Sequence, residues 1–311
     1  MPHDVDISVV IPTYNCADFL PRALESVQNQ RMDSIEVIVV NDGSTDHTAS
    51  VLDSWQSRFS HFRVIESQNV GVNAARNLAI ASCKGEYVAF LDADDFWYDG
   101  KLKKQFQFCI DNEDVVLTCT NYDHLTESLE YIIDCYAYMQ RAVLDNRIHD
   151  YKVLPKAPAY LLGYNLVGTS TVMAKTQALQ NVGGFNTELK SASDWDLWLR
   201  LSTQGKVAHC GRPYAGYLVR QGSISSNRKL RIDCMREIID TYAALPEFNQ
   251  KWAVKAAHAH INEGYGDFYR QMSAPAKALK HDIQSMLLEP SIRRLKHICK
   301  DYKMMFRKRW A

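Results

Sequence analysis

An α/β fold with a mostly parallel sheet is predicted by short β-branched runs that alternate with segments of helical periodicity. The runs at 7–11 and 35–40 flank a segment, 19–27, in which apolar residues recur every three or four positions. This is the pattern of a strand–helix–strand unit, which places successive strands in parallel and helices on both faces of the sheet. The chain of 311 residues, 46% of them hydrophobic, can bury one large core and an additional helical unit.

The same alternation continues along the first part of the chain, with Ser44 or Thr45 as the expected N-cap of the second helix. The further expected elements are a helix through 51–55, a strand at 62–65, a helix at 74–82, a strand at 87–91, helix and loop from 100 to 156, a strand at 169–174 and a helix at 191–201. Beyond residue 226 the strand pattern disappears. We therefore expect an α/β domain over 1–226, a helical region over 227–290 and a separate tail over 291–311.

Composition and charge exclude several classes of protein. The 36 basic and 36 acidic residues cancel, so the uniform positive field of a nucleic-acid-binding protein is not expected. No apolar run reaches the length of a membrane span, and the N-terminus lacks the pattern of a signal peptide. The eight cysteines include no C-x-x-C motif. These features predict a cytoplasmic protein with reduced thiols.

Polar residues follow three of the predicted strands, where sheets of this kind bind their ligands. They are Pro12-Thr13-Tyr14-Asn15 after the first strand, Asn41-Asp42-Gly43-Ser44 after the second and Asp92-Ala93-Asp94-Asp95 after the fourth. Three carboxylates within four residues repel one another unless a cation compensates them. Carboxylates favour hard ions such as Mg²⁺ or Mn²⁺, which commonly keep coordination positions open for phosphates. An acidic turn that caps the following helix is the alternative.

Several motifs together resemble glycosyltransferase family 2, in order and at family-like spacing over residues 6 to 226. They are the segments 8–15, 41–46, 71–77, 92–95 and 183–185, and Asp194-Trp195-Asp196-Leu197-Trp198-Leu199-Arg200. The resemblance implies the GT-A fold and an inverting transfer from a nucleotide-activated sugar, with a UDP-sugar as the expected donor. It also implies a glycan or lipid-linked acceptor in the synthesis of a cell-surface polysaccharide.

The resemblance further implies roles for individual residues. Pro12, Tyr14 and Asp42 would hold the base of the nucleotide, and Arg76 would lie near it. Asp92 and Asp94 would form the family's DxD motif, with Asp94 as the principal ligand of Mn²⁺ or Mg²⁺.

The acidic base motif of the family aligns on Asp194, which would take the proton of the attacking acceptor hydroxyl. The alternative is that Asp194 only stabilises the first turn of a helix, where negative charge is favourable. Two positions depart from the family pattern: Ser193 stands where Glu is usual, and Arg220 stands where His is frequent. A guanidinium cannot ligate a metal, but it pairs with phosphate oxygens in a forked geometry, so we expect Arg220 to neutralise the diphosphate.

Two other readings of the α/β domain stay open. A sugar-nucleotide pyrophosphorylase shares the general architecture but needs a Gly-rich, basic first loop, against which Pro12-Thr13-Tyr14-Asn15 argues. A non-catalytic nucleotide-sugar-binding protein is supported only by the departure at Ser193.

The segment 291–311 is strongly basic, since eight Lys and Arg against the single Asp301 give a net charge of +7. Apolar residues recur there at helical spacing: Ile292, Leu295, Ile298, Cys299, Tyr302, Met305, Phe306 and Trp310. An apolar stripe flanked by cations is typical of a helix that lies on an anionic membrane. We therefore expect a peripheral position at the cytoplasmic face of the membrane. The alternative is a helix docked on the protein with a solvated basic face.

Overall fold

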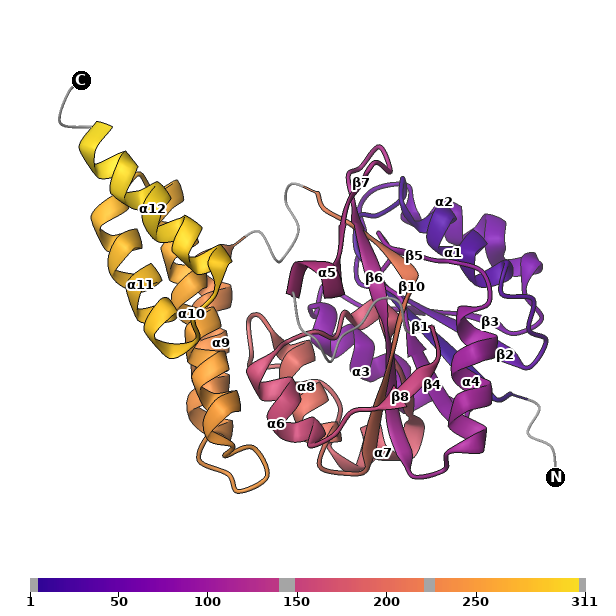
Figure 1. Ribbon diagram of the computed structural model, residues 1–311. Helices are drawn as coiled ribbons and strands as arrows, with labels where there is room; N and C mark the ends of the chain where they lie inside the picture. Colours follow the sequence, from indigo (N-terminus) through magenta and orange to yellow (C-terminus); the bar gives the residue numbers. More distant parts are fainter. Residues whose placement is uncertain (1–4, 140–148, 221–226, 308–311) are drawn as a thin grey trace. The chain divides into compact units, whose positions relative to one another are not determined.

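The computed structural model describes residues 5–139, 149–220 and 227–307 and divides into two compact units (Figure 1). The α/β unit comprises residues 1–155, 166–187 and 193–220, and the helical unit comprises residues 156–165, 188–192 and 221–311. The predicted boundary at 226 falls in 221–226, and this segment and residues 308–311 of the predicted tail lie outside the described residues.

The α/β unit is built on one sheet whose path runs in the order β3-β2-β1-β4-β9-β6-β10-β5. The strands are β1 (Ile7–Thr13), β2 (Ile35–Asn41), β3 (Phe62–Glu66), β4 (Tyr87–Phe90), β5 (Phe96–Trp97), β6 (Val115–Leu125), β7 (Tyr131–Asp134), β8 (Tyr151–Val153), β9 (Met173–Lys175) and β10 (Lys206–Leu218). The strands β3, β2, β1 and β4 are parallel, as their alternation with helices predicts. Their carboxyl ends therefore meet at one edge of the sheet.

The second half of the sheet is mixed. β9 pairs antiparallel with both β4 and β6, whereas β6 and β10 are parallel. The prediction of only helix and loop over 100–156 is wrong, because β6 lies in this segment. It is buried along 115–121, and its polar residues Thr118, Thr120 and Asn121 are buried with the apolar ones, so it shows no alternating pattern.

Helices cover both faces of this sheet. They are α1 (Leu20–Gln28), α2 (Thr48–Trp55), α3 (Val72–Ser82), α4 (Lys101–Asp111), α5 (Cys135–Met139), α7 (Thr176–Asn181) and α8 (Ser193–Leu201), with the 3₁₀ turns η1 (Gln56–Arg58) and η2 (Thr169–Thr171). One core joins β1 to α1 and α4 through residues such as Val9, Leu24 and Leu102. On the other face, the Phe90 ring packs edge-on against Phe185 and at a tilt against Trp198 of α8.

Two local predictions need correction. The helix α2 begins at Thr48 with His47 at the N-cap, so neither Ser44 nor Thr45 caps it. The carboxylate of Asp46 instead accepts the backbone N–H of Thr48 at 3.0 Å. The strand predicted at 169–174 begins only at Met173, because residues Thr169–Thr171 form the 3₁₀ turn η2.

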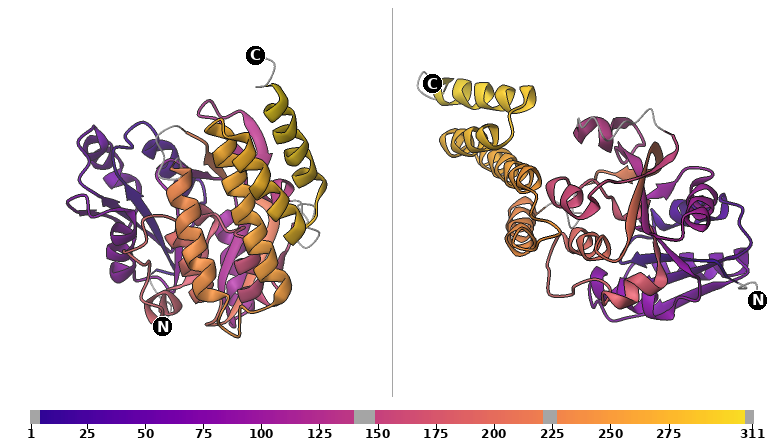
Figure 2. Two further views of the ribbon diagram at one scale, coloured as in Figure 1. Left: turned by 90° about the vertical axis from the view of Figure 1, so that its left-hand side faces the viewer. Right: turned by 60° about the horizontal axis from the view of Figure 1, so that its bottom comes forward.

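The helical unit contains α6 (Ala157–Gly163), α9 (Arg228–Tyr242), α10 (Lys251–Gln271), α11 (Pro275–Leu288) and α12 (Ile292–Arg307). The last four follow one another side by side, as Figure 2 shows. α6 packs on α10, where the Gly163 carbonyl accepts a hydrogen bond from His260 Nδ1 at 3.0 Å. Among the described residues, no helix has the length and apolar character that a membrane span requires.

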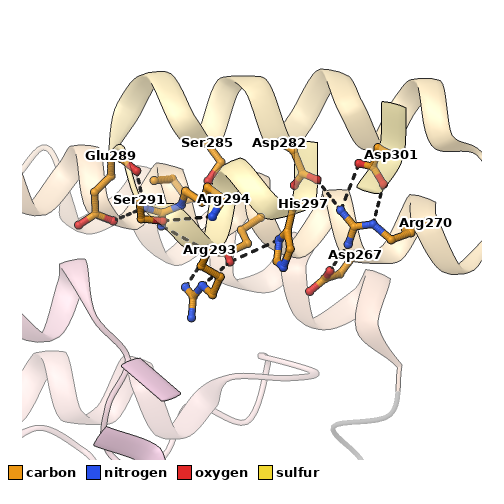
Figure 3. Close-up of polar contacts among 12 residues, drawn as sticks. Asp267, Arg270, Asp282, Ser285, Glu289, Ser291, Arg293, Arg294, His297 and Asp301 are labelled. Carbon is orange, nitrogen blue, oxygen red and sulfur yellow. Dashed lines mark hydrogen bonds and ion pairs between the residues drawn. The ribbon is translucent and has the colours of Figure 1, made fainter. Parts of the chain in front are cut away.

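Ion pairs connect α10, α11 and α12 (Figure 3). Arg270 of α10 donates to Asp301 of α12 at 2.6 Å and also pairs with Asp267 and with Asp282 of α11. Asp282 and Asp301 are buried. Burial, together with the carboxyl hydrogen bond to Asp301, raises the pKa of Asp282 to about 8. The Asp282 carboxyl therefore keeps its proton over most of the physiological pH range.

This raised pKa makes the stability of the helical unit depend on pH. Because the pKa of Asp282 is raised in the folded state, its contribution is complete below the ordinary carboxyl pKa and is lost as the pH rises through about 8. We expect the thermal midpoint to fall between about pH 5 and pH 9. Asp282→Asn should flatten this profile, because an amide both accepts from Arg270 and donates to Asp301. Thermal melts followed by circular dichroism measure the midpoint at each pH, with Asp240→Asn on the exposed side of α9 as the control. If the midpoint of Asp282→Asn depended on pH as steeply as that of the unaltered protein, the prediction would be wrong.

Candidate active site

The loops that follow β1 and β2 are held together by hydrogen bonds of Asn15. The Asn15 N–H donates to Ser44 Oγ at 3.0 Å, and Asn15 Oδ1 accepts the N–H of Thr45 at 2.7 Å. Gly43 adopts a φ of +74°, which turns the second loop toward the first. Tyr14 lies beside this junction and is 46% exposed. The two loops thus form a fixed frame with an aromatic ring at its surface.

Asp42 is buried directly after β2 and organises the segment that precedes α3. Its Oδ1 accepts from the Ser67 hydroxyl and the Val70 N–H, both at 2.7 Å, and its Oδ2 accepts from the Gly71 N–H at 2.8 Å. A carboxylate has about four acceptor positions, so these three bonds leave one for a further donor. Pro12, on the neighbouring strand β1, lies next to Val40 in register.

Arg76 of α3 and Asp92, at the loop after β4, form an ion pair. The Arg76 side chain is buried, with its guanidinium carbon 5.0 Å from the centre of the Phe185 ring. Its Nε has no hydrogen-bond partner among the described residues. Arg76 therefore places a fixed positive charge beside the acidic motif.

Asp94 forms a second ion pair, in which Arg220 Nε lies 2.6 Å from Asp94 Oδ2. Arg220 follows the end of β10, and its guanidinium lies over the Phe19 ring at 5.0 Å. Its Nη2 is 3.8 Å from Cys16 Sγ, and burial raises the pKa of this thiol. The two aspartates of the motif are thus each matched by an arginine.

Asp95 has a structural position in the same motif. It is buried, and it accepts from the Ser170 hydroxyl at 2.5 Å and from the Leu218 N–H at 3.2 Å. Burial, with the charges of Asp94 and Asp92, raises its pKa well above that of an ordinary aspartate. Through Leu218, Asp95 links the acidic loop to the end of β10 and so positions Arg220.

Asp194 lies in the first turn of α8 and contacts the turn η2. Its Oδ2 accepts the Thr169 hydroxyl at 3.2 Å, and its Oδ1 accepts the N–H of Trp195 at 2.8 Å. Ser193 donates to Asn73 Oδ1 of α3 at 2.6 Å, so it ties α8 to α3. Asp196 is buried and lies 2.7 Å from Arg200, which makes it a structural ion pair.

The turn η2 brings the acidic motif and Asp194 together, which sequence reasoning missed. Ser170 accepts the Asp92 N–H at 3.1 Å and donates to Asp95, while the adjacent Thr169 donates to Asp194. The run of β-branched residues at this point indicated a strand. The only signal in the sequence was the hydroxyl side chains of Thr169 and Ser170 directly after Gly168, which can support neighbouring carboxylates by hydrogen bonds.

The chemistry of the donor set fits a hard divalent ion. The side chains of Asp92 and Asp94 are 28% and 21% exposed, and each uses one oxygen for its arginine. The second oxygen of each carboxylate takes no part in these ion pairs and is of the kind that hard divalent ions prefer. Within the parts of the chain that are described, no group of three or more His, Cys, Asp or Glu forms a metal site by itself. Two carboxylates alone do not complete the coordination of such an ion, so a substrate and water would have to supply the remaining ligands.

Comparison with known proteins assigns the family. Residues 8–153 match the family described as glycosyl transferase family 2. TuaG of Bacillus subtilis, named for teichuronic acid biosynthesis, is 30% identical over 226 residues, which cover 71% of this chain and 82% of that protein. The chain belongs to glycosyltransferase family 2. An uncharacterized glycosyltransferase of Rickettsia typhi is 30% identical over 198 residues. The matched part of the chain spans only 58% of that relative, and 20% of the chondroitin synthase of Pasteurella multocida.

Among solved structures, the 1–349 fragment of S. aureus TarS in complex with UDP-GlcNAc superposes with a TM-score of 0.65 at 18% identity. The match covers 96% of this chain and 89% of that one. It confirms the predicted GT-A fold. The carboxyl edge of the sheet in this chain holds Tyr14, Asp42 and Asp92.

Proposed function

We propose that this protein transfers a sugar, with inversion, from a UDP-sugar to a glycan or lipid-linked acceptor in the synthesis of a cell-surface polysaccharide. The observation that carries the proposal is the turn η2, whose adjacent residues Ser170 and Thr169 hold the acidic motif and Asp194. Leaving-group chemistry and base chemistry need separate carboxylates at a fixed spacing, and this turn provides it.

The nucleotide is assigned to the frame made by the first two loops. Tyr14 offers an exposed aromatic face to the base, and Asp42 keeps one acceptor position for a base N–H. Pro12, beside Val40 near the end of β1, is assigned to the same frame. That TarS was solved with UDP and with UDP-GlcNAc supports a uridine donor. The buried cation of Arg76 lies near the nucleotide through its pair with Asp92.

The diphosphate is assigned to Asp94, Asp92 and Arg220. The two aspartates would hold Mn²⁺ or Mg²⁺, with Asp94 as the principal ligand; the ion, when bound, stabilises the charge that grows on the departing diphosphate. Arg220 can exchange Asp94 for phosphate oxygens, because its forked guanidinium matches both partners. This neutralisation is strongest where water is excluded.

Asp194 is assigned as the general base. An inverting transfer needs a proton acceptor on the acceptor side, so that the hydroxyl loses its proton as it attacks the anomeric carbon. The hydrogen bonds from Thr169 and from the Trp195 N–H hold the Asp194 carboxylate in one orientation. Ser193, in the place of the usual Glu, supports α8 through Asn73 rather than supplying a second carboxylate.

The site of action is assigned to the cytoplasmic face of an anionic membrane, where lipid-linked acceptors and growing polysaccharides are accessible. The segment 291–311 would provide the attachment, and its net charge of +7 supports this. Nucleic acid is not proposed as a partner, because the chain as a whole carries no net charge.

Product release distinguishes this proposal from its alternatives. Incubation with a panel of nucleotide sugars and Mn²⁺ should liberate UDP from one donor, slowly into water and faster once an acceptor is present. A pyrophosphorylase would instead release a sugar phosphate when given pyrophosphate, and a binding protein would release nothing. A coupled assay measures the UDP that is released. Thermal shift identifies donors that bind without turnover.

A further inference from the structure

The helix α12 docks through its charged residues. Arg294 and Asp301, seven residues apart on one face, are 1% and 0% exposed. Arg294 pairs with Glu289 at 2.8 Å, and Asp301 pairs with Arg270 (Figure 3). Arg294 also lies 3.4 Å from Glu263. Docked amphipathic helices ordinarily bury their apolar side. Here the two fully buried side chains are charged, and their ion pairs, with the half-buried Ile298, Met304 and Met305, define the docked side of α12.

The opposite side of α12, which we call the outer face, is apolar. Ile292, Leu295, Tyr302 and Phe306 are 76%, 49%, 57% and 41% exposed, and Cys299 is exposed between them. Their spacing of three and four residues gives one continuous stripe along the helix. A contiguous exposed stripe of large apolar side chains marks an interaction surface.

Cations flank this stripe. Lys296, Lys300 and Lys303 are exposed on the same helix, and its one acidic residue, Asp301, is buried. Arg293 and Arg294 do not add to this surface, because both pair with Glu263. The outer face therefore combines apolar side chains with positive charge and presents no carboxylate, which matches the surface of an anionic bilayer.

We propose that the outer face of α12 binds anionic lipid bilayers while the helix stays docked on α10 and α11. This deepens the membrane attachment proposed above and identifies the residues that contact lipid. The apolar stripe inserts at the level of the headgroups, and the three lysines contact lipid phosphates. No helix needs to unfold or undock, because the ion pairs of Arg294 and Asp301 already turn the stripe outward.

The first test uses the unaltered protein. Flotation should recover it with vesicles in which about one third of the lipid is phosphatidylglycerol, and much less with phosphatidylcholine alone. High salt should release only part of it, because insertion of apolar residues does not depend on salt. Reaction of Cys299 with a water-soluble thiol reagent should slow when the anionic vesicles are present, since this thiol lies within the stripe. No donor sugar is added, so the result is independent of the proposed catalysis.

Variants separate the two components of binding. Lys296→Gln with Lys300→Gln should weaken partitioning by about thirtyfold at low salt, since each cation contributes about 1 kcal/mol, or about fivefold. Leu295→Gln with Tyr302→Gln should weaken it by about tenfold or more at every salt concentration. The matched controls on exposed positions of α4, Lys103→Gln with Lys104→Gln and Ile110→Gln, should bind as the unaltered protein does.

Two results would overturn the proposal. One is equal recovery with neutral and anionic vesicles, or no recovery with either. The other is a dimer in light scattering that Leu295→Gln with Tyr302→Gln converts to monomer without any change in vesicle binding, because the stripe would then contact a second copy. UDP release measured on the same variants without vesicles reports separately on the proposed catalysis.

Discussion

Replacing Asp194 by Asn should lower the rate of sugar transfer by about 10²- to 10⁴-fold while donor affinity stays within a few-fold of the original. The amide keeps the shape of the side chain and can still accept from Thr169. It cannot take the proton of the acceptor hydroxyl, so only the rate of the transfer step should fall. Single-turnover transfer and donor titration by thermal shift measure the two quantities separately.

The control for this variant is the neighbouring aspartate of the same helix. Asp196→Asn weakens a buried ion pair with Arg200, so it should lower the thermal midpoint but leave transfer by the folded protein nearly unchanged. Asp194 would be a binding residue instead if its Asn variant lost donor affinity and kept its turnover.

Replacing Asp94 by Ala should abolish Mn²⁺-dependent donor binding and transfer and leave the fold intact. The residue lies in a loop, is partly exposed and contacts Arg220 rather than the core. Its loss removes the principal proposed metal ligand and frees Arg220, so residual donor binding should no longer respond to Mn²⁺. Calorimetric titration of the donor with and without Mn²⁺, beside circular dichroism, makes the comparison.

The control for this variant is Asp53→Ala, which also removes one carboxylate but at an exposed position of α2. It should bind donor and Mn²⁺ as the unaltered protein does. Full metal-dependent activity in Asp94→Ala would refute the assignment of the acidic motif.

The first half of the sheet and its ligand-binding edge were predictable from sequence, because parallel strands impose strong local patterns. The β-branched runs and the polar residues that follow them predict Tyr14, Asp42 and Asp92 directly after the ends of neighbouring strands, as the structure has them. The periodicity gives the strands, and the strand ends give the residues expected at the ligand-binding edge. The roles assigned to these residues stay predictions until the variants are measured.

The strand β6 and the docked side of α12 could not be predicted, because both depend on contacts with residues distant in the sequence. Buried polar residues of β6, such as Thr118, are satisfied by Gln105 of α4 at 3.2 Å, so the strand lacks an apolar signature. The docking face of α12 is decided by Glu263 and Arg270, both more than one helix earlier. Helical spacing alone shows that a stripe exists but not which side of the helix faces solvent.

The turn η2 also bears on how specificity can diverge among such enzymes. Because Thr169 and Ser170 are neighbours, one short and buried piece of backbone contacts both the acidic motif and Asp194. Under the proposed function, we expect insertions or substitutions in the loops that border this turn to change the sugar or the acceptor while the spacing of the acidic motif and Asp194 is kept.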